Sequence, residues 1–84
     1  MQGNIGVYVS KAFVLINMDL GKGVALTEGL KGIPEVKEFY NVYGVYDYVV
    51  RIEAETIEQL KDIITTKISN LKYIRSTLTM LVVE

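Results

Sequence analysis

The hydrophobic positions of this 84-residue chain follow strand and helix periods in turn, and together they predict four strands and two helices. A nearly continuous apolar run at residues 12–18 predicts a strand that is covered on both faces. Segments at about 36–43 and 46–54, rich in tyrosine and β-branched residues, predict two more strands, and about 73–83 predicts a last one. Residues 1–10 alternate at strand period around Ile5, Val7 and Val9, so they form either a loose end or an extra edge strand.

Two segments between these strands show helical spacing. The first helix is predicted to follow a loop at residues 19–23 and to run to about Gly32, with one apolar face made of Leu26, Leu30 and Ile33. Gly29 costs such a helix about 1 kcal/mol relative to alanine, so it predicts close packing on the sheet. The second helix is predicted from a capping box at Thr56 and Gln59 to about residue 70. Its apolar stripe consists of Ile57, Leu60, Ile63, Ile64, Ile68 and Leu71.

The element order β-α-β-β-α-β predicts an α+β, ferredoxin-like domain over residues 11–84. Right-handed crossovers then give one antiparallel sheet with strand order 4-1-3-2 and both helices on one face. The other face has no helix, yet apolar residues are predicted on or near it, namely Phe13, Leu15, Phe39, Val49, Leu81 and Val83. Such a face is expected to pack on a second sheet, which predicts a homodimer or a larger assembly.

The amino-acid composition excludes several kinds of catalytic and binding site. Cysteine and histidine are absent, which excludes disulfides, thiolate nucleophiles and imidazole bases, and no metal or other cofactor is expected. Nine basic and ten acidic residues, scattered along the chain, give no footprint for a nucleic-acid backbone. No apolar run approaches the roughly 20 residues that a membrane span requires, and the first residues do not resemble a signal peptide. The sequence therefore predicts a cytoplasmic protein that binds neither nucleic acid nor membrane directly.

The stretch 40–53 carries the strongest candidate for a site. It holds four of the six tyrosines, and Gly44 is its one turn former, so a tight hairpin with a positive φ at Gly44 is predicted. Asp47 follows the bend. A carboxylate among aromatic residues at a hairpin tip either caps the turn backbone or faces a polar ligand.

These residues resemble the effector-binding (RAM) domain of the Lrp/AsnC family of transcription regulators. The resemblance runs from Ala12 to Val83 and is most specific at Tyr-Gly-Val-Tyr-Asp-Tyr and Arg-Ser-Thr-Leu-Thr. Family members usually carry an N-terminal helix-turn-helix domain, so the chain looks like a stand-alone version. The resemblance implies paired sheets, assembly of dimers into rings, contact with full-length Lrp/AsnC regulators, and free amino acids as effectors bound between subunits. The ligand-binding residues implied are Gly44, Val45, Tyr46, Asp47, Thr77 and Thr79.

An amino acid presents an ammonium and a carboxylate, and Asp47 with the amides around Gly44 offers partners for both. Thr77 and Thr79 are half-exposed β-formers or pocket residues, whereas Ser76 lies on the opposite face by alternation. The hairpin and the last strand are separated by the first strand, about 10 Å at roughly 4.8 Å per strand. The two groups are therefore expected to meet across a subunit boundary. Val45 departs from the polar residue that many relatives have at the turn, which bears on the identity of the ligand.

Two other functions share this fold. An ACT-like regulatory domain would bind its amino acid at the loop after the first strand, here residues 19–23, a loop that could also hold an anion at the following helix. A small dimeric α/β-barrel enzyme would use the helix-free face as a cavity. Without histidine or cysteine, and with no paired carboxylates, the chain offers little for acid-base catalysis, so it is not expected to be an enzyme.

Overall fold

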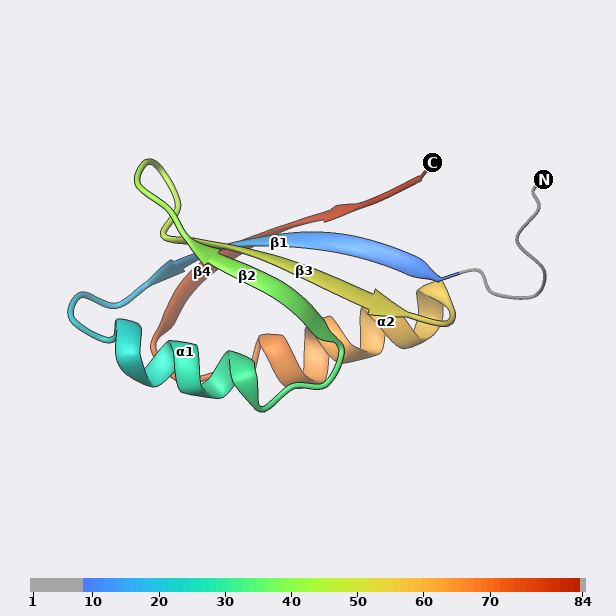
Figure 1. The fold of residues 1–84 in the computed structure, drawn as a ribbon, viewed down its shortest axis with the longest axis horizontal. Coiled ribbons are helices and arrows are strands. Elements are labelled where there is room, and N and C mark those ends of the chain that lie inside the picture. The colour runs from blue at the N-terminus through green and yellow to red at the C-terminus, as the bar shows by residue number, and fades with distance from the viewer. Residues whose placement is uncertain (1–8, 84) are drawn as a thin grey trace.

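Two helices cover one face of a four-stranded antiparallel sheet, and the other face carries no helix (Figure 1). The structure is a computed structural model that describes residues 9–83. Its elements are β1 (Ser10–Met18), α1 (Gly23–Lys31), β2 (Val36–Asn41), β3 (Tyr48–Ala54), α2 (Ile57–Ile63), a π-helical turn η1 (Ile64–Ile68) and β4 (Ile74–Leu81). The strand order is β2-β3-β1-β4. The predicted ferredoxin-like fold and strand order are confirmed.

The predicted extra edge strand at residues 1–10 falls mostly outside the described residues. Ser10 is already the first residue of β1. No helix of residues 9–83 has the length and apolar character needed to cross a membrane.

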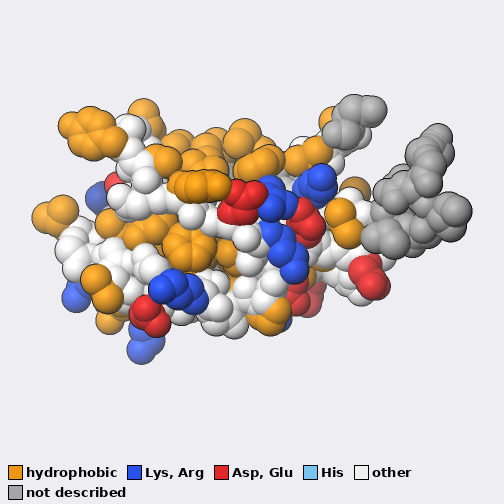
Figure 2. All heavy atoms as spheres, viewed as in Figure 1, with side chains coloured by type: hydrophobic (Ala, Val, Ile, Leu, Met, Phe, Trp, Pro, Cys, Tyr) orange, Lys and Arg blue, Asp and Glu red, His pale blue; other side chains and the backbone are white. Residues whose placement is uncertain are grey.

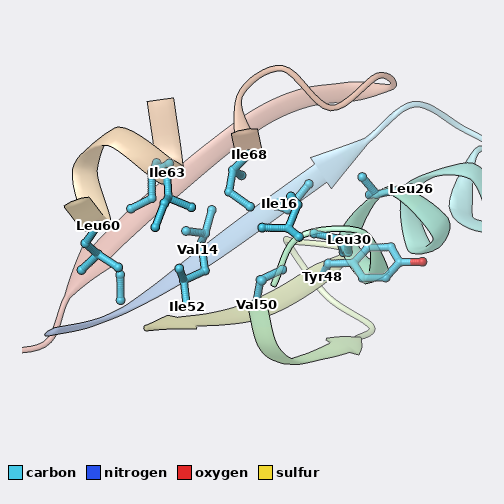
Figure 3. Close-up of a cluster of buried hydrophobic side chains, with 13 residues drawn as sticks. Val14, Ile16, Leu26, Leu30, Tyr48, Val50, Ile52, Leu60, Ile63 and Ile68 are labelled. Carbon is cyan, nitrogen blue, oxygen red and sulfur yellow. The ribbon is translucent and has the colours of Figure 1, made fainter. Parts of the chain in front are cut away.

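The core lies between the sheet and the helices (Figure 3). Val14 and Ile16 of β1 and Val50 and Ile52 of β3 have no exposed surface, because alternate residues of a strand point to the same face. The helices contribute Leu26, Leu30, Leu60, Ile63 and Ile68. Burying each such side chain stabilises the fold by about 1.5–3 kcal/mol, so this single face supplies the main driving force for folding.

Both helices depart in detail from the predictions. Gly29 does make a close approach, but a Cβ there would lie 2.7 Å from Leu71 Cδ2, so its neighbour is the segment after η1 and the predicted contact with the sheet is wrong. The second helix starts at the predicted cap, where the Gln59 N–H donates to Thr56 Oγ1 at 3.1 Å. It then widens into η1, whose last turn is closed by the Ser69 N–H donating to the Ile64 carbonyl at 2.9 Å. Periodicity did not predict this π-turn.

The register of the strands shows which side chains share the helix-free face. Directly opposite residues in an antiparallel pair point to the same side, and Phe13, Leu15 and Val49 alternate with the buried set, as predicted. Phe39 pairs with Val50 and packs against the core, so its predicted position is wrong.

The last strand also needs a correction. Leu81 pairs with the buried Ala12 and so lies on the helix side, while Val83 follows the end of β4. Leu78 and Met80, opposite Leu15 and Phe13, take the place expected for Leu81. The error arose because β2 and β4 carry apolar residues in both alternating sets, so pattern alone does not decide which set faces the helices.

Candidate functional site

A loop of residues 42–47 joins β2 to β3 and rises from the helix-free side of the sheet (Figure 1). The predicted tight hairpin is therefore wrong in length, because β2 ends at Asn41 and β3 begins only at Tyr48. The predicted positive φ at Gly44 is confirmed, at 153°. The Val42 N–H donates to the Asp47 carbonyl at 2.8 Å and closes the base of the loop. The tip is exposed and apolar, since Tyr43 and Val45 have relative exposures of 106% and 84%.

Asp47 ties this loop to the end of β1. Its Oδ2 accepts the Met18 N–H at 2.9 Å, and its own N–H donates to the Ile16 carbonyl at 2.8 Å. The sequence left open whether this carboxylate caps its own turn or faces a ligand. In the structure the carboxylate accepts a backbone N–H of the neighbouring strand β1, which is neither its own turn nor a ligand.

The two predicted threonines lie on the other side of the sheet from the loop. Thr77 pairs with Ile16 and Thr79 with Val14, both of which point to the helices. Both threonines are exposed on β4, which is an edge strand of the sheet. Within one chain, therefore, the structure brings together Gly44, Val45, Tyr46 and Asp47 but does not bring Thr77 and Thr79 to them.

Ser76 is on the same side as the loop. It pairs with Asn17, whose Nδ2 donates to Ser76 Oγ at 3.3 Å. A hollow of about 330 Å³ lies here, lined by Asn17, Val45, Arg75 and Ser76. The loop and the start of β4, expected to be a strand apart, thus line one hollow of the same chain.

Arg75 owes its place in this hollow to an irregularity of β4. The register between β1 and β4 shifts there, with Asn17 opposite Ser76 and Met18 opposite Ile74, so Arg75 has no residue opposite it. A β-bulge of this kind changes the direction in which a side chain leaves the strand. Sequence reasoning missed Asn17 and Arg75, although Arg75 opens the Arg-Ser-Thr-Leu-Thr motif and Asn17 is the one polar residue in an otherwise apolar run.

The helix-free face combines an apolar area with a charged corner. Hydrophobic side chains gather along this side (Figure 2), and those in register are Phe13, Leu15, Val49, Leu78 and Met80. At the corner Arg51 pairs with Glu38, with its Nε 2.9 Å from Glu38 Oε2, and with Glu53. A hydrogen bond from the Tyr40 hydroxyl, together with the Arg51 guanidinium, lowers the pKa of Glu38. The same carboxylate raises the pKa of Tyr40.

The loop at residues 19–23, which is the binding site expected for an ACT-like domain, has glycine and backbone contacts that are typical of a turn. Gly21 has a φ of 76°, which a glycine adopts without strain, and the Asp19 N–H donates to the Tyr73 carbonyl at 2.7 Å. Tyr48 anchors the following helix from the core, where its hydroxyl is hydrogen-bonded to Thr27 Oγ1 at 2.9 Å and donates to the Gly23 carbonyl at 3.2 Å. These contacts hold α1 on the sheet and leave no polar group of Tyr48 unpaired.

Comparison with known proteins decides the family. The family model of the Lrp/AsnC ligand binding domain matches residues 11–84. This chain belongs to the Lrp/AsnC family. Its solved relatives include FFRP-DM1, 40% identical with a TM-score of 0.84, where the match covers 88% of this chain and 99% of that one. The hypothetical protein PHS023 from Pyrococcus horikoshii is also 40% identical, with a TM-score of 0.82 and 92% of each chain covered.

A curated relative of this Lrp/AsnC domain is the HTH-type transcriptional regulator FL11 from Pyrococcus horikoshii. It is 31% identical over 77 residues, which is 92% of this chain and 50% of the regulator. The chain thus spans about half the length of the curated relatives that it matches.

The hollow beside loop 42–47 of the Lrp/AsnC domain is lined mostly by polar side chains. Within residues 9–83 no three His, Cys, Asp or Glu side chains cluster in a way that could hold a metal ion. The hollow supplies a guanidinium, a hydroxyl, a carboxamide and one apolar side chain. These groups can bind and orient a small polar molecule.

Proposed function

We propose that this chain is an effector-sensing module that binds a free amino acid beside loop 42–47. The match of residues 11–84 to a ligand-binding domain is the observation that carries the proposal. The hollow supports it, because Arg75 suits a carboxylate and the exposed backbone around Gly44 offers further hydrogen-bonding groups. Gly44, Val45, Tyr46 and Asp47 remain the proposed site residues within one chain, where Asp47 acts by holding the loop on β1. Thr77 and Thr79 would be supplied across a subunit boundary.

Self-association is the second part of the proposal. Leu78 and Met80 are each 46% exposed beside Phe13, Leu15 and Val49, so an apolar area on this face has no cover within the described chain. Pairing this face with a second copy would remove that area from water. Dimers would then assemble further through the protruding loops, whose tips expose Tyr43 and Val45.

A partner regulator would carry the signal to DNA. About half of the length of regulators such as FL11 matches this domain, so these regulators would present a related fold for mixed assembly. We propose that the chain acts in the cytoplasm by modulating such full-length regulators, that it does not bind DNA directly, and that it is not an enzyme.

A thermal-shift screen against the twenty amino acids tests the ligand class. A ligand that binds only the folded protein at 100 times its Kd adds about 2.7 kcal/mol of stability, so the melting temperature should rise for one amino acid or a small group. Gly44→Val should abolish the response, since a β-branched residue resists this φ, while Ile57→Val, on the exposed start of α2, should keep it. If no amino acid at millimolar concentration shifts the melting temperature, amino-acid binding is refuted.

Sedimentation velocity of the same preparation tests self-association. A dimer or larger species is expected at micromolar concentration. A monomer at that concentration would contradict the pairing of sheets.

A further inference from the structure

We propose that Arg75 reads the carboxylate of the ligand and that the hollow selects small monocarboxylates with an apolar substituent, whether or not they carry an ammonium group. This inference rests on the proposed function, because it places the effector in the hollow beside loop 42–47. It goes further in assigning the charge that is recognised. The resulting ligand class includes 2-oxo acids as well as amino acids.

The lining of the hollow carries a positive charge. Of Asn17, Val45, Arg75 and Ser76, only Arg75 is charged, and in the described chain it forms no salt bridge. A guanidinium binds a carboxylate through two parallel hydrogen bonds, whereas it repels an ammonium. The hollow therefore favours an anionic group over a cationic one.

Asp47 is the acidic group closest in sequence to the loop tip, and its side chain already has a partner. Its Oδ2 is already bound to the Met18 N–H at 2.9 Å, and it does not line the hollow. An ammonium in the hollow would have only the neutral oxygens of Asn17 and Ser76 as side-chain acceptors. Losing the ammonium should then cost little affinity.

The hollow is small and has one apolar side chain in its lining. At about 330 Å³ the hollow is at the lower end of the range for ligand sites, roughly 300–1,000 Å³. Val45 is its apolar wall, and Arg75, which has no residue opposite it on β1, lines the same hollow. A short branched substituent can contact Val45 while the carboxylate meets Arg75.

Isothermal titration of the assembled full chain tests the inference with matched probes. The probes are L-valine, L-leucine and L-methionine, the 2-oxo acids of the same three carbon skeletons, and isobutylamine, which has an ammonium but no carboxylate. We expect the best 2-oxo acid to bind within about tenfold of its amino acid, and isobutylamine not to bind. Arg75→Gln should weaken both carboxylates by about tenfold or more, on the scale of a charge-assisted hydrogen bond. Arg75→Lys should fall between, because it keeps the charge and loses the fork.

Lys72→Gln is the matched control, since it removes a positive charge close to Arg75 in the sequence that lines a different hollow, and it should leave every affinity unchanged. If the amino acids bind but their 2-oxo acids do not, or if Arg75→Gln binds as the parent does, the inference fails and the proposed function stands. If the 2-oxo acids bind and no amino acid does, recognition of the carboxylate by Arg75 holds, but tolerance of the ammonium group and the proposed function both fail. Binding by none of the carboxylates refutes both. Melting temperatures of the Arg75 variants verify that they are folded.

Discussion

The two faces of the sheet carry similar apolar residues but differ in how far these residues are buried. On the helix side Val14, Ile16 and Val50 have no exposed surface, whereas on the other side Phe13, Leu15 and Val49 are only half-buried. Both sets are apolar, so composition does not distinguish them. A small domain buries limited surface in its own fold. One face of this sheet therefore forms the core of the fold, and the other leaves apolar surface uncovered within the described chain, which makes it the face proposed for association.

Truncation on the two faces should separate these roles most strongly. Ile16→Ala should lower the free energy of unfolding of the single chain by about 2–5 kcal/mol, because it leaves a cavity under the helices. Leu15→Ala, the adjacent residue on the other face, should cost much less at protein concentrations where the chain is monomeric. Urea unfolding at low concentration measures both. Equal losses would show that the faces do not differ as we describe.

A charge on the helix-free face should break association next. Leu15→Glu removes an apolar side chain and asks a carboxylate to enter the contact, so we expect the dimer to weaken by at least about 2 kcal/mol, or about thirtyfold in Kd. Sedimentation equilibrium measures this. Ile57→Glu is the control, since it makes a comparable change at the exposed start of α2, where a negative charge is tolerated. If Leu15→Glu associates as tightly as Ile57→Glu, another surface holds the dimer.

The sequence predicted the architecture because local signals agree. The run at residues 12–18, the cap at Thr56 and the apolar spacing of both helices all led to the observed elements. Prediction from the sequence failed where the face on which a residue lies depends on how the strands pair. The faces of Phe39 and Leu81 follow from strand register, which apolar residues in both alternating sets leave open.

The candidate site was predicted only on the loop side. Gly44 has the predicted positive φ because its requirement is local, within its own backbone. The hollow was missed because it depends on a register shift between β1 and β4, which places Arg75 beside residues far away in sequence. No pattern within β4 alone encodes that shift. The alternation that set Ser76 apart from Thr77 and Thr79 was sound, but it did not tell which set faces the loop.

Substitutions at Asp47 and Thr79 should also differ in their effect on the free energy of unfolding, by smaller amounts. Asp47→Ala leaves the Met18 N–H without its partner on the loop side, so we expect a loss of about 1–2 kcal/mol in the free energy of unfolding. Thr79→Val, exposed on the edge strand, should change stability by less than about 0.5 kcal/mol. Denaturant unfolding compares the two, and Asp47→Asn, which keeps an acceptor oxygen, should recover part of the loss. Should Asp47→Ala be neutral, its bond to β1 has no structural weight.

The charged corner of the helix-free face should give the smallest effect, and one that depends on pH. The Tyr40 hydroxyl and Arg51 lower the pKa of Glu38 below its ordinary value of 4.5. The unfolded chain therefore binds more protons at this residue, so its stabilising contribution is present above pH 4.5 and is lost as the pH falls through the lowered pKa. The melting temperatures of the parent and Glu38→Gln should differ slightly at pH 7 and converge on acidification. Tyr40→Phe removes the largest cause and should move the pKa of Glu38 upward, which NMR titration of the carboxyl carbon detects. A Glu38 pKa at or above 4.5 in the parent would show that the corner is merely solvated and does not organise this face.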